Sequence, residues 1–187
     1  MGGDCGTHVD SPSHFIAGAR TISDLQLGEL IAPLIIVDVE AQCADNADYE
    51  LNVEDLLRWE AKHGRIPDRG LVCMRTGWSR RFCDVTRYRN TNEQTKQMHF
   101  PGFSRAAAEF LTTERNIVGV GIDTLSLDAG ISQTFDCHQV MFAHDKYQVE
   151  NLMLDGICES GAVIAVLPLR VKQAPEMMAR VVAFVPR

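Results

Sequence analysis

The sequence predicts a single mixed α/β domain. Short runs of β-branched and other apolar residues are typical of buried strands, and segments with helical periodicity separate them. The chain has 187 residues, 45% of them apolar, which suits one domain with a sizeable core. No repeat, low-complexity run or interdomain linker interrupts the chain, which favours one domain.

The expected strands follow one another from the first third of the chain to its end. Pro33 is expected to end a short helix built on Ile22, Leu25, Leu27 and Leu30, and a strand is expected to begin directly after it. Further strands are predicted wherever an apolar run lies between turn residues. The predicted strands span residues 34–39, 71–76, 117–122, 146–149, 161–167 and 179–185.

Two longer helices have clear start signals. Asn52 is a plausible N-cap with acidic residues in the next turn, and the helix is expected to stop at His63-Gly64. Ser104 is the expected cap of a second helix over residues 106–111. A short helix is predicted at 139–142, and the acidic stretch 40–50 is predicted to be a loop.

Charge and composition exclude several classes of partner. Eighteen basic and 25 acidic residues give a net charge of −7, which argues against nucleic acid or an anionic membrane surface. No apolar run approaches the roughly 20 residues of a membrane span, and the first residues lack the pattern of a signal peptide. The six cysteines contain no C-x-x-C pair, which is typical of reduced thiols and predicts a cytoplasmic protein.

Residues 6–15, Gly-Thr-His-Val-Asp-Ser-Pro-Ser-His-Phe, carry the densest chemistry in the chain. In an extended segment, His8 and Asp10 point to the same face, and a turn could bring His14 nearby. Imidazole with carboxylate is a ligand set that suits zinc and, with more oxygen, manganese. The alternative is a polar turn between two strands, but three such side chains within seven residues favour a site.

This stretch resembles the Gly-Thr-His-x-Asp-x-Pro-x-His motif of the cyclase family of metal-dependent hydrolases, which includes bacterial kynurenine formamidases and isatin hydrolases. Blocks at 101–104, 119–124 and 138–152 are also similar to that family. The resemblance implies a swivelling β/β/α architecture over residues 1–187. The family usually has a longer upstream segment, and residues 1–187 are expected to lack it, as a truncated form, a short gene model or a real variant.

The resemblance also implies a metal centre, with one or two divalent ions per chain. Asp10 would bridge two ions, one held by His8 and the other by His138 and Glu150. The family usually carries a histidine four residues before His8, where this chain has Asp4. A carboxylate there could keep the ion while favouring harder cations such as manganese over zinc, or the first site could be lost.

The implied reaction is hydrolysis of an amide, formamide or lactam by a metal-activated water. His14 would then be a proton shuttle and not a ligand. N-formylkynurenine, from tryptophan catabolism, is the best-known substrate in the family. The rival hypotheses are an inactive metal-binding homologue with an altered first metal site, and an interaction protein in which the motif is coincidental. A homodimer or larger homo-oligomer is also implied.

The stretch 77–97 is longer and more polar than a simple connection needs. Trp78 and Phe82 are predicted to form a pocket wall for a small planar substrate, and the alternative is a basic, aromatic surface loop. Asp123, at the end of a predicted strand, is either a residue that organises the site from behind the ligands or a turn cap. His63 and His144 are expected to lie outside the site.

Overall fold

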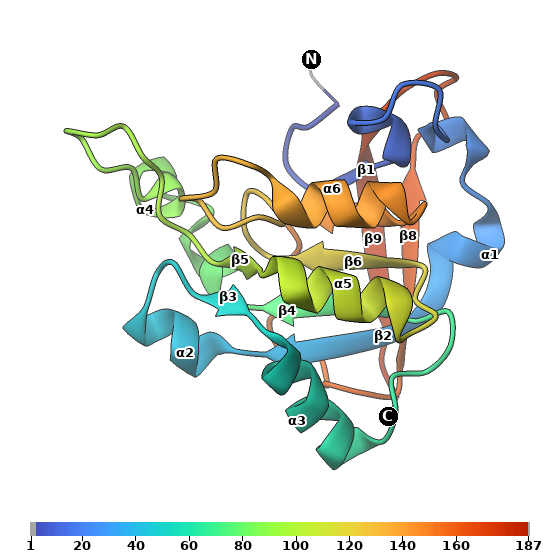
Figure 1. Ribbon diagram of the computed structural model, residues 1–187, viewed down its shortest axis with the longest axis horizontal. Coiled ribbons are helices and arrows are strands. Elements are labelled where there is room, and N and C mark those ends of the chain that lie inside the picture. The colour runs from blue at the N-terminus through green and yellow to red at the C-terminus, as the bar shows by residue number, and fades with distance from the viewer. Residues whose placement is uncertain (1–2, 187) are drawn as a thin grey trace.

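Seven strands close into one barrel in the computed structural model, which describes residues 3–186 (Figure 1). The order around the barrel is β1-β7-β6-β4-β2-β8-β9. The four central strands run parallel, whereas β1, β8 and β9 join antiparallel. The strand bounds are β1 His8–Asp10, β2 Ile31–Asp38, β4 Leu71–Arg75, β6 Gly119–Ile122, β7 Tyr147–Glu150, β8 Ala162–Pro168 and β9 Glu176–Phe184.

Helices α3, α5 and α6 cover one side of the parallel strands and lie in front of them in Figure 1, whereas α1 packs against the core on the other face. A pair of two-residue strands, β3 and β5, lies beside this layer. No helix among residues 3–186 combines the length and apolarity that crossing a membrane requires. The remaining bounds are β3 Glu50–Leu51, β5 Gly102–Phe103, α1 Leu27–Leu30, α2 Glu40–Asp45, α3 Val53–His63, α4 Val85–Arg89, α5 Arg105–Thr113 and α6 Asp136–Ala143, with single 3-10 turns at Pro12–His14, Ile22–Asp24 and Trp78–Arg81.

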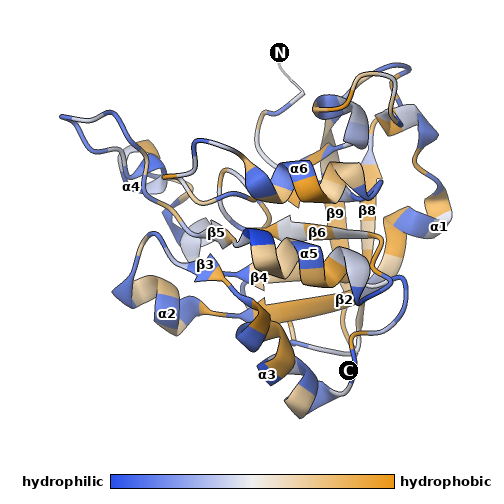
Figure 2. Cartoon of the chain, in the orientation of Figure 1, coloured by the Kyte–Doolittle hydropathy of each residue, from blue (hydrophilic) through white to orange (hydrophobic). Residues whose placement is uncertain are grey.

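Two apolar cores lie on opposite faces of the parallel strands. Ile35 and Val37 of β2 pack under the helices, while Leu34 and Ile36 belong to the second core with residues of β8. The centre of β2, residues 34–37, is continuously apolar, as expected of a strand that is covered on both faces, and Figure 2 shows it in the orange of hydrophobic residues. This is the mixed α/β domain that the sequence predicts.

The helix caps expected from the sequence are present. Asn52 accepts a hydrogen bond from the backbone N–H of Asp55, and Ser104 accepts one from that of Ala107. Each satisfies an N–H group that would otherwise lack a partner in the first helical turn. The starts of α3 and α5 could therefore be predicted from local sequence.

Two local predictions were wrong. Residues 40–45 form helix α2 instead of a loop, and Cys43 is buried in the helix-side core, so tertiary packing stabilises a turn that the acidic sequence obscures. Pro33 lies within β2 and does not end a helix. It pairs with β8 only, because the pairing of β2 with β4 starts at Leu34, so its missing N–H removes no bond on that side.

The barrel brings chemically active residues to one edge. Strand β7 ends at Glu150, which lies directly opposite His8 in the antiparallel pairing with β1. On its other side β1 pairs with β9, and there Asp10 lies opposite Glu176. Helix α6 follows the same edge and carries His138. The carboxyl ends of parallel strands are where open α/β sheets place their ligands.

Candidate metal centre

A cavity of about 520 Å³ opens at this edge of the barrel. It lies between β1, the end of β7, the start of β9 and helix α6. Six of the eight side chains that the sequence nominated for the site contribute to its wall. The cavity is lined by Asp4, Gly6, His8, Asp10, His14, Phe15, Arg89, Leu125, Ser126, Phe135, His138, Glu150, Asn151 and Glu176.

Two imidazoles and two carboxylates interleave at the cavity floor. Nε2 of His8 lies 3.6 Å from Oδ1 of Asp10 and 3.4 Å from Oε2 of Glu150. On the other side, Nε2 of His138 lies 3.3 Å from Oε1 of Glu150 and 3.9 Å from Oδ2 of Asp10. All four side chains are at most 5% exposed. Each carboxylate therefore faces both imidazoles.

The polar atoms of this cluster are not satisfied by one another. Oδ1 of Asp10 is buried and has no hydrogen-bond partner among residues 3–186. Gln148, opposite Asp10 on β7, also has a buried side chain without a partner in that part of the chain. Donor atoms of His8, Asp10 and Glu150 lie within 4.8 Å of one another. Nitrogen and oxygen donors at this spacing fit a zinc or manganese ion.

The pKa values of the four side chains at the cavity floor also indicate a cation site. Burial raises the pKa of Asp10 to about 7, and the nearby charge of Glu150 adds to the effect. Burial alone would lower the pKa of both histidines, but their contacts with the carboxylates raise it to about 9 for His8 and about 10 for His138. The pKa of Glu150 falls to about 2, because its contacts with the two histidines outweigh burial. The cluster thus strongly favours positive charge between its carboxylates, which a cation would supply.

The Nδ1 atoms of both floor histidines, His8 and His138, contact oxygen atoms. Nδ1 of His8 lies 2.8 Å from the carbonyl oxygen of Gly6, and Nδ1 of His138 lies 2.5 Å from Oδ2 of Asp128. Asp128 also accepts hydrogen bonds from the first backbone N–H groups of α6, at Cys137 and His138. Such contacts fix the ring and leave Nε2 free to face the cavity. The sequence analysis gave Asp128 no role, although its place shortly after a buried strand was a usable signal.

His14 lies at the side of the cavity, and its side chain is 30% exposed. Its Nδ1 is 3.2 Å from Oε2 of Glu176, a residue that the sequence analysis did not single out. Burial lowers the pKa of His14 below its ordinary value; Glu176 opposes this shift and the charge of His138 adds to it. The ring is consequently neutral and able to accept a proton near neutral pH.

Asp4 lines the cavity but is exposed. It belongs to neither of the clusters of possible ligands found among the described residues. Glu150 was expected to hold the second ion together with His138, but it lies about as close to His8 as to His138. The structure therefore gathers His8, Asp10, His138 and Glu150 and leaves Asp4 at the rim.

Trp78 and Phe82 do not reach the cavity. Trp78 is 1% exposed and packs in an apolar cluster with Tyr88 and Phe100, and its Nε1 donates to the carbonyl of Tyr88. Phe82 packs edge-on against Tyr88 and is half-exposed. The aromatic rings that line the cavity are instead Phe15 and Phe135.

The loop that follows Trp78 nevertheless touches the site. The hydroxyl of Tyr88 donates to Oδ1 of Asn151 at 2.7 Å, and Arg89 lines the cavity. Asp123 accepts hydrogen bonds from the backbone N–H and the hydroxyl of Thr76, joining the ends of β6 and β4. None of its hydrogen bonds involves the candidate ligands, so of the two expectations the holding of a turn is the one observed.

Comparisons with known proteins agree with this geometry. Residues 1–129 match the sequence profile of the family described as "Putative cyclase". The chain is 31% identical to isatin hydrolase from Roseibium aggregatum, covering all of this chain and 73% of that protein. It is 29% identical to kynurenine formamidase from Bordetella petrii, covering 90% of this chain and 70% of that protein. The solved structure of isatin hydrolase A from Ralstonia solanacearum superposes with a TM-score of 0.93 at 34% identity, covering 99% and 73%.

Proposed function

Because this chain belongs to the cyclase family, we propose that it is a metal-dependent hydrolase of an amide, formamide or lactam, acting on a C–N bond that is not a peptide bond. The observation that carries the proposal is the buried cluster of His8, Asp10, His138 and Glu150, with a carboxylate oxygen that lacks a partner within residues 3–186. An interaction protein would gain nothing from four ionisable groups buried in one cavity, because burying charge is costly.

The four buried side chains would hold one or two divalent ions, zinc or manganese. Asp10 and Glu150 each face both imidazoles, which supports a bridging role for Asp10. When bound, such an ion supplies Lewis acidity, which polarises a carbonyl group and acidifies water. Asp4, at the rim, would complete the shell of the first ion only by turning inward.

His14 would move the protons of the reaction. Its neutral ring can take a proton from the attacking water as the new C–O bond forms. It can then give that proton to the leaving nitrogen as the C–N bond breaks. Its place at the side of the cavity, partly open to solvent, supports this role.

The cavity wall supports a small planar substrate. The rings of Phe15 and Phe135 lie 6.0 Å apart at a steep angle, and Phe15 stacks on His138 with ring centroids 5.1 Å apart. Flat aromatic walls favour flat ligands. Isatin and formylated aromatic amines are therefore the first compounds to test, consistent with the names of the relatives.

Two further proposals concern architecture. The superposition on isatin hydrolase A supports the swivelling β/β/α arrangement. The outward side of β8 and β9 supports a homodimer or larger homo-oligomer, because Val163, Leu167, Val182 and Phe184 are all exposed there.

The test uses purified protein supplied with zinc or manganese and a panel of isatin, N-formylkynurenine and formanilide. We expect hydrolysis that stops on chelation and returns with metal. His14→Ala should lower turnover by about 10²- to 10⁴-fold while the metal content stays near that of the wild type. Loss of the ion in that variant would make His14 a ligand. Stoichiometric metal with no hydrolysis of any compound would favour an inactive metal-binding relative.

A further inference from the structure

Glu176 lies at the cavity without a role in the proposed chemistry. It is the first residue of β9 and stands opposite Asp10 in the pairing of β9 with β1. Its Oε2 atom is 3.2 Å from Nδ1 of His14. Among residues 3–186, no other carboxylate lies within ion-pair distance of His14. The closure of the barrel, and not local sequence, makes this contact.

The contact with Glu176 determines which ring nitrogen of His14 carries the proton. A neutral histidine has one N–H and one bare nitrogen, and a carboxylate beside Nδ1 draws the proton to that atom. Nε2, across the ring, is then the bare nitrogen and can accept a proton. Phe142 limits the same ring from another side, with ring centroids 6.2 Å apart and planes at 77°. Packing and a charged contact thus both constrain His14.

We propose that Glu176 is a positioning residue for His14, an inference that rests on the proposed hydrolase function. Its carboxylate holds the proton on Nδ1 and directs Nε2 to the cavity, where water and the leaving nitrogen of a substrate would lie. The arrangement follows the general pattern of a base oriented by a third group. It predicts that the carboxylate acts on turnover and not on substrate or metal affinity.

The same atoms suggest a competing explanation. Donor atoms of Asp10, His14 and Glu176 lie within 4.8 Å of one another, which is also a spacing that suits a cation. An ion there would occupy the histidine nitrogen that the positioning role needs. Metal content therefore has to be measured alongside activity.

The first experiment compares Glu176→Ala and Glu176→Gln with the wild-type holoenzyme. Lys172→Ala is the matched control, because Lys172 is an exposed residue four positions before Glu176 and outside both the cavity wall and the exposed apolar face of β8 and β9. We expect Glu176→Ala to lower kcat by about 10- to 100-fold with KM and metal content near wild type. Glu176→Gln, whose amide oxygen can still accept from Nδ1–H, should recover part of the loss. Added formate should restore kcat of Glu176→Ala in a saturable way.

Three outcomes would overturn the proposal. Loss of the ion in Glu176→Ala would assign the cluster to a cation. A higher KM with unchanged kcat would make Glu176 a substrate contact. Unchanged kinetics, as in Lys172→Ala, would leave Glu176 with no role in turnover.

A second experiment does not depend on activity. In protein labelled with ¹⁵N-histidine, nitrogen chemical shifts report the tautomer of His14, with His14→Ala identifying its signals. We expect the Nδ1–H form in the wild type and a shift towards Nε2–H in Glu176→Ala. An Nε2–H ring in the wild type would overturn the proposal even if the enzyme is active. The expected tautomer in a protein that hydrolyses nothing would instead count against the proposed function alone.

Discussion

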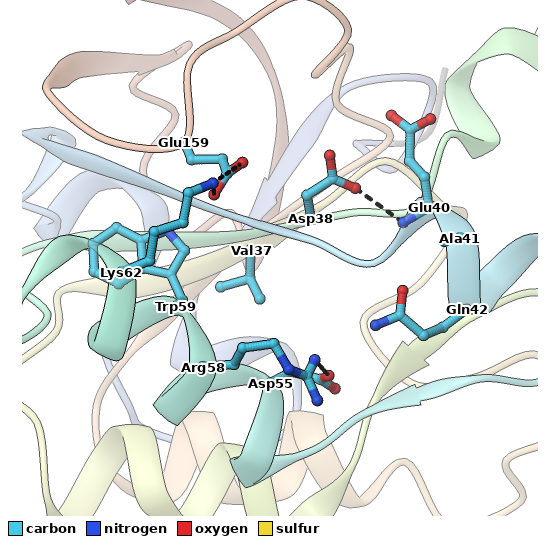
Figure 3. Close-up of a pocket in the computed structure, with 10 residues that line it drawn as sticks. All are labelled: Val37, Asp38, Glu40, Ala41, Gln42, Asp55, Arg58, Trp59, Lys62 and Glu159. Carbon is cyan, nitrogen blue, oxygen red and sulfur yellow. Dashed lines mark hydrogen bonds and ion pairs between the residues drawn. The ribbon is translucent and has the colours of Figure 1, made fainter.

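Two hollows of nearly equal size lie on this molecule, and their charges are arranged in opposite ways. The groove in Figure 3, of about 500 Å³, lies between the end of β2 and helices α2 and α3. In it, Arg58 pairs with Asp55 at 2.8 Å and Lys62 with Glu159 at 3.0 Å. The side chains of Arg58 and Lys62 are 65% and 63% exposed. In the candidate metal centre, the charged floor is buried and incompletely paired.

Cavity volume alone does not identify a ligand site. Exposed ion pairs contribute little to stability and are easily replaced, so the groove needs no ligand to explain it. A buried carboxylate oxygen without a partner has a real cost, which a bound group must offset. In the groove, the buried polar atom without a partner among the described residues is Nε1 of Trp59, a neutral N–H. Asp55 is also buried in the groove, but it is paired with Arg58 and accepts a hydrogen bond from Tyr49. Buried charge that is incompletely paired, and not cavity size, therefore distinguishes the candidate metal centre.

The largest expected effect follows from Asp10→Asn. Removing the carboxylate shared by both histidines should release the ion and lower activity by about 10²-fold or more. Burial raises the pKa of the Asp10 carboxyl to about 7, and the uncharged amide avoids that cost of burying a charge, so the metal-free protein should become more stable by about 1–3 kcal/mol. Metal analysis, kinetics and urea unfolding of the metal-free forms measure these effects. Retention of both ion and turnover would show that the buried floor is not the metal centre.

A substitution at Asp123 tests whether burial or hydrogen bonding sets the pKa of a carboxylate that lies outside both cavities. Burial raises its pKa to about 6, although hydrogen bonds from Thr76 oppose the shift. Between pH 4 and 6 the native state keeps a proton that the unfolded chain releases. This contribution to stability is therefore full below about pH 4 and is lost as pH rises to about 6, by about 3 kcal/mol.

The measurement is the free energy of unfolding across that pH range in the wild type and in Asp123→Asn. The difference between the two proteins should change with pH by the stated amount, since the amide does not titrate. Parallel pH profiles would mean that the Thr76 hydrogen bonds keep Asp123 ionised throughout.

A smaller effect is expected for a charged residue that orients a candidate ligand but does not itself line the cavity. Asp128→Asn should weaken metal affinity by about 10- to 100-fold, because His138 loses the carboxylate that orients its ring. Asp136→Asn, at the start of the same helix and facing Arg105, is the control. Titration of the metal-free proteins with zinc measures the change. Equal affinities in the two variants would show that the contact with Asp128 does not tune the site.

The smallest effect should come from the groove. Lys62→Ala removes an exposed ion pair with Glu159 and should change stability by less than about 1 kcal/mol. Activity and metal content should match the wild type. A clear loss of turnover in Lys62→Ala would instead give the groove a part in the chemistry.

Local sequence was enough for part of this structure. The caps Asn52 and Ser104, and the alternation of His8 and Asp10, are short-range signals whose physics acts within a few residues. His138 and Glu150 were nominated only through the family resemblance, because a single histidine and a single glutamate have no local signature.

The remaining contacts depend on long-range pairing. Glu176 reaches the cavity through the register of β9 against β1, which no local pattern encodes. Trp78 was expected in a pocket wall, but the carbonyl of Tyr88 and the neighbouring aromatic cluster draw it into the interior. The helix α2 formed against its acidic composition because Cys43 is buried. In each case tertiary packing decided what the local sequence left open.

The three-residue strand β1 completes the circle of strands, since it sits between β7 and β9. Strand β1, at His8–Asp10, is synthesised before both of its partners, β7 at Tyr147–Glu150 and β9 at Glu176–Phe184. Pairing β1 with these two strands closes a loop of well over a hundred residues. Closing so long a loop costs conformational entropy, which slows this step of folding. His8 and Asp10 meet Glu150 only at that moment. Assembly of the candidate metal centre and closure of the barrel are therefore expected to be one event, and the site would stay incomplete until β7 and β9 have been made.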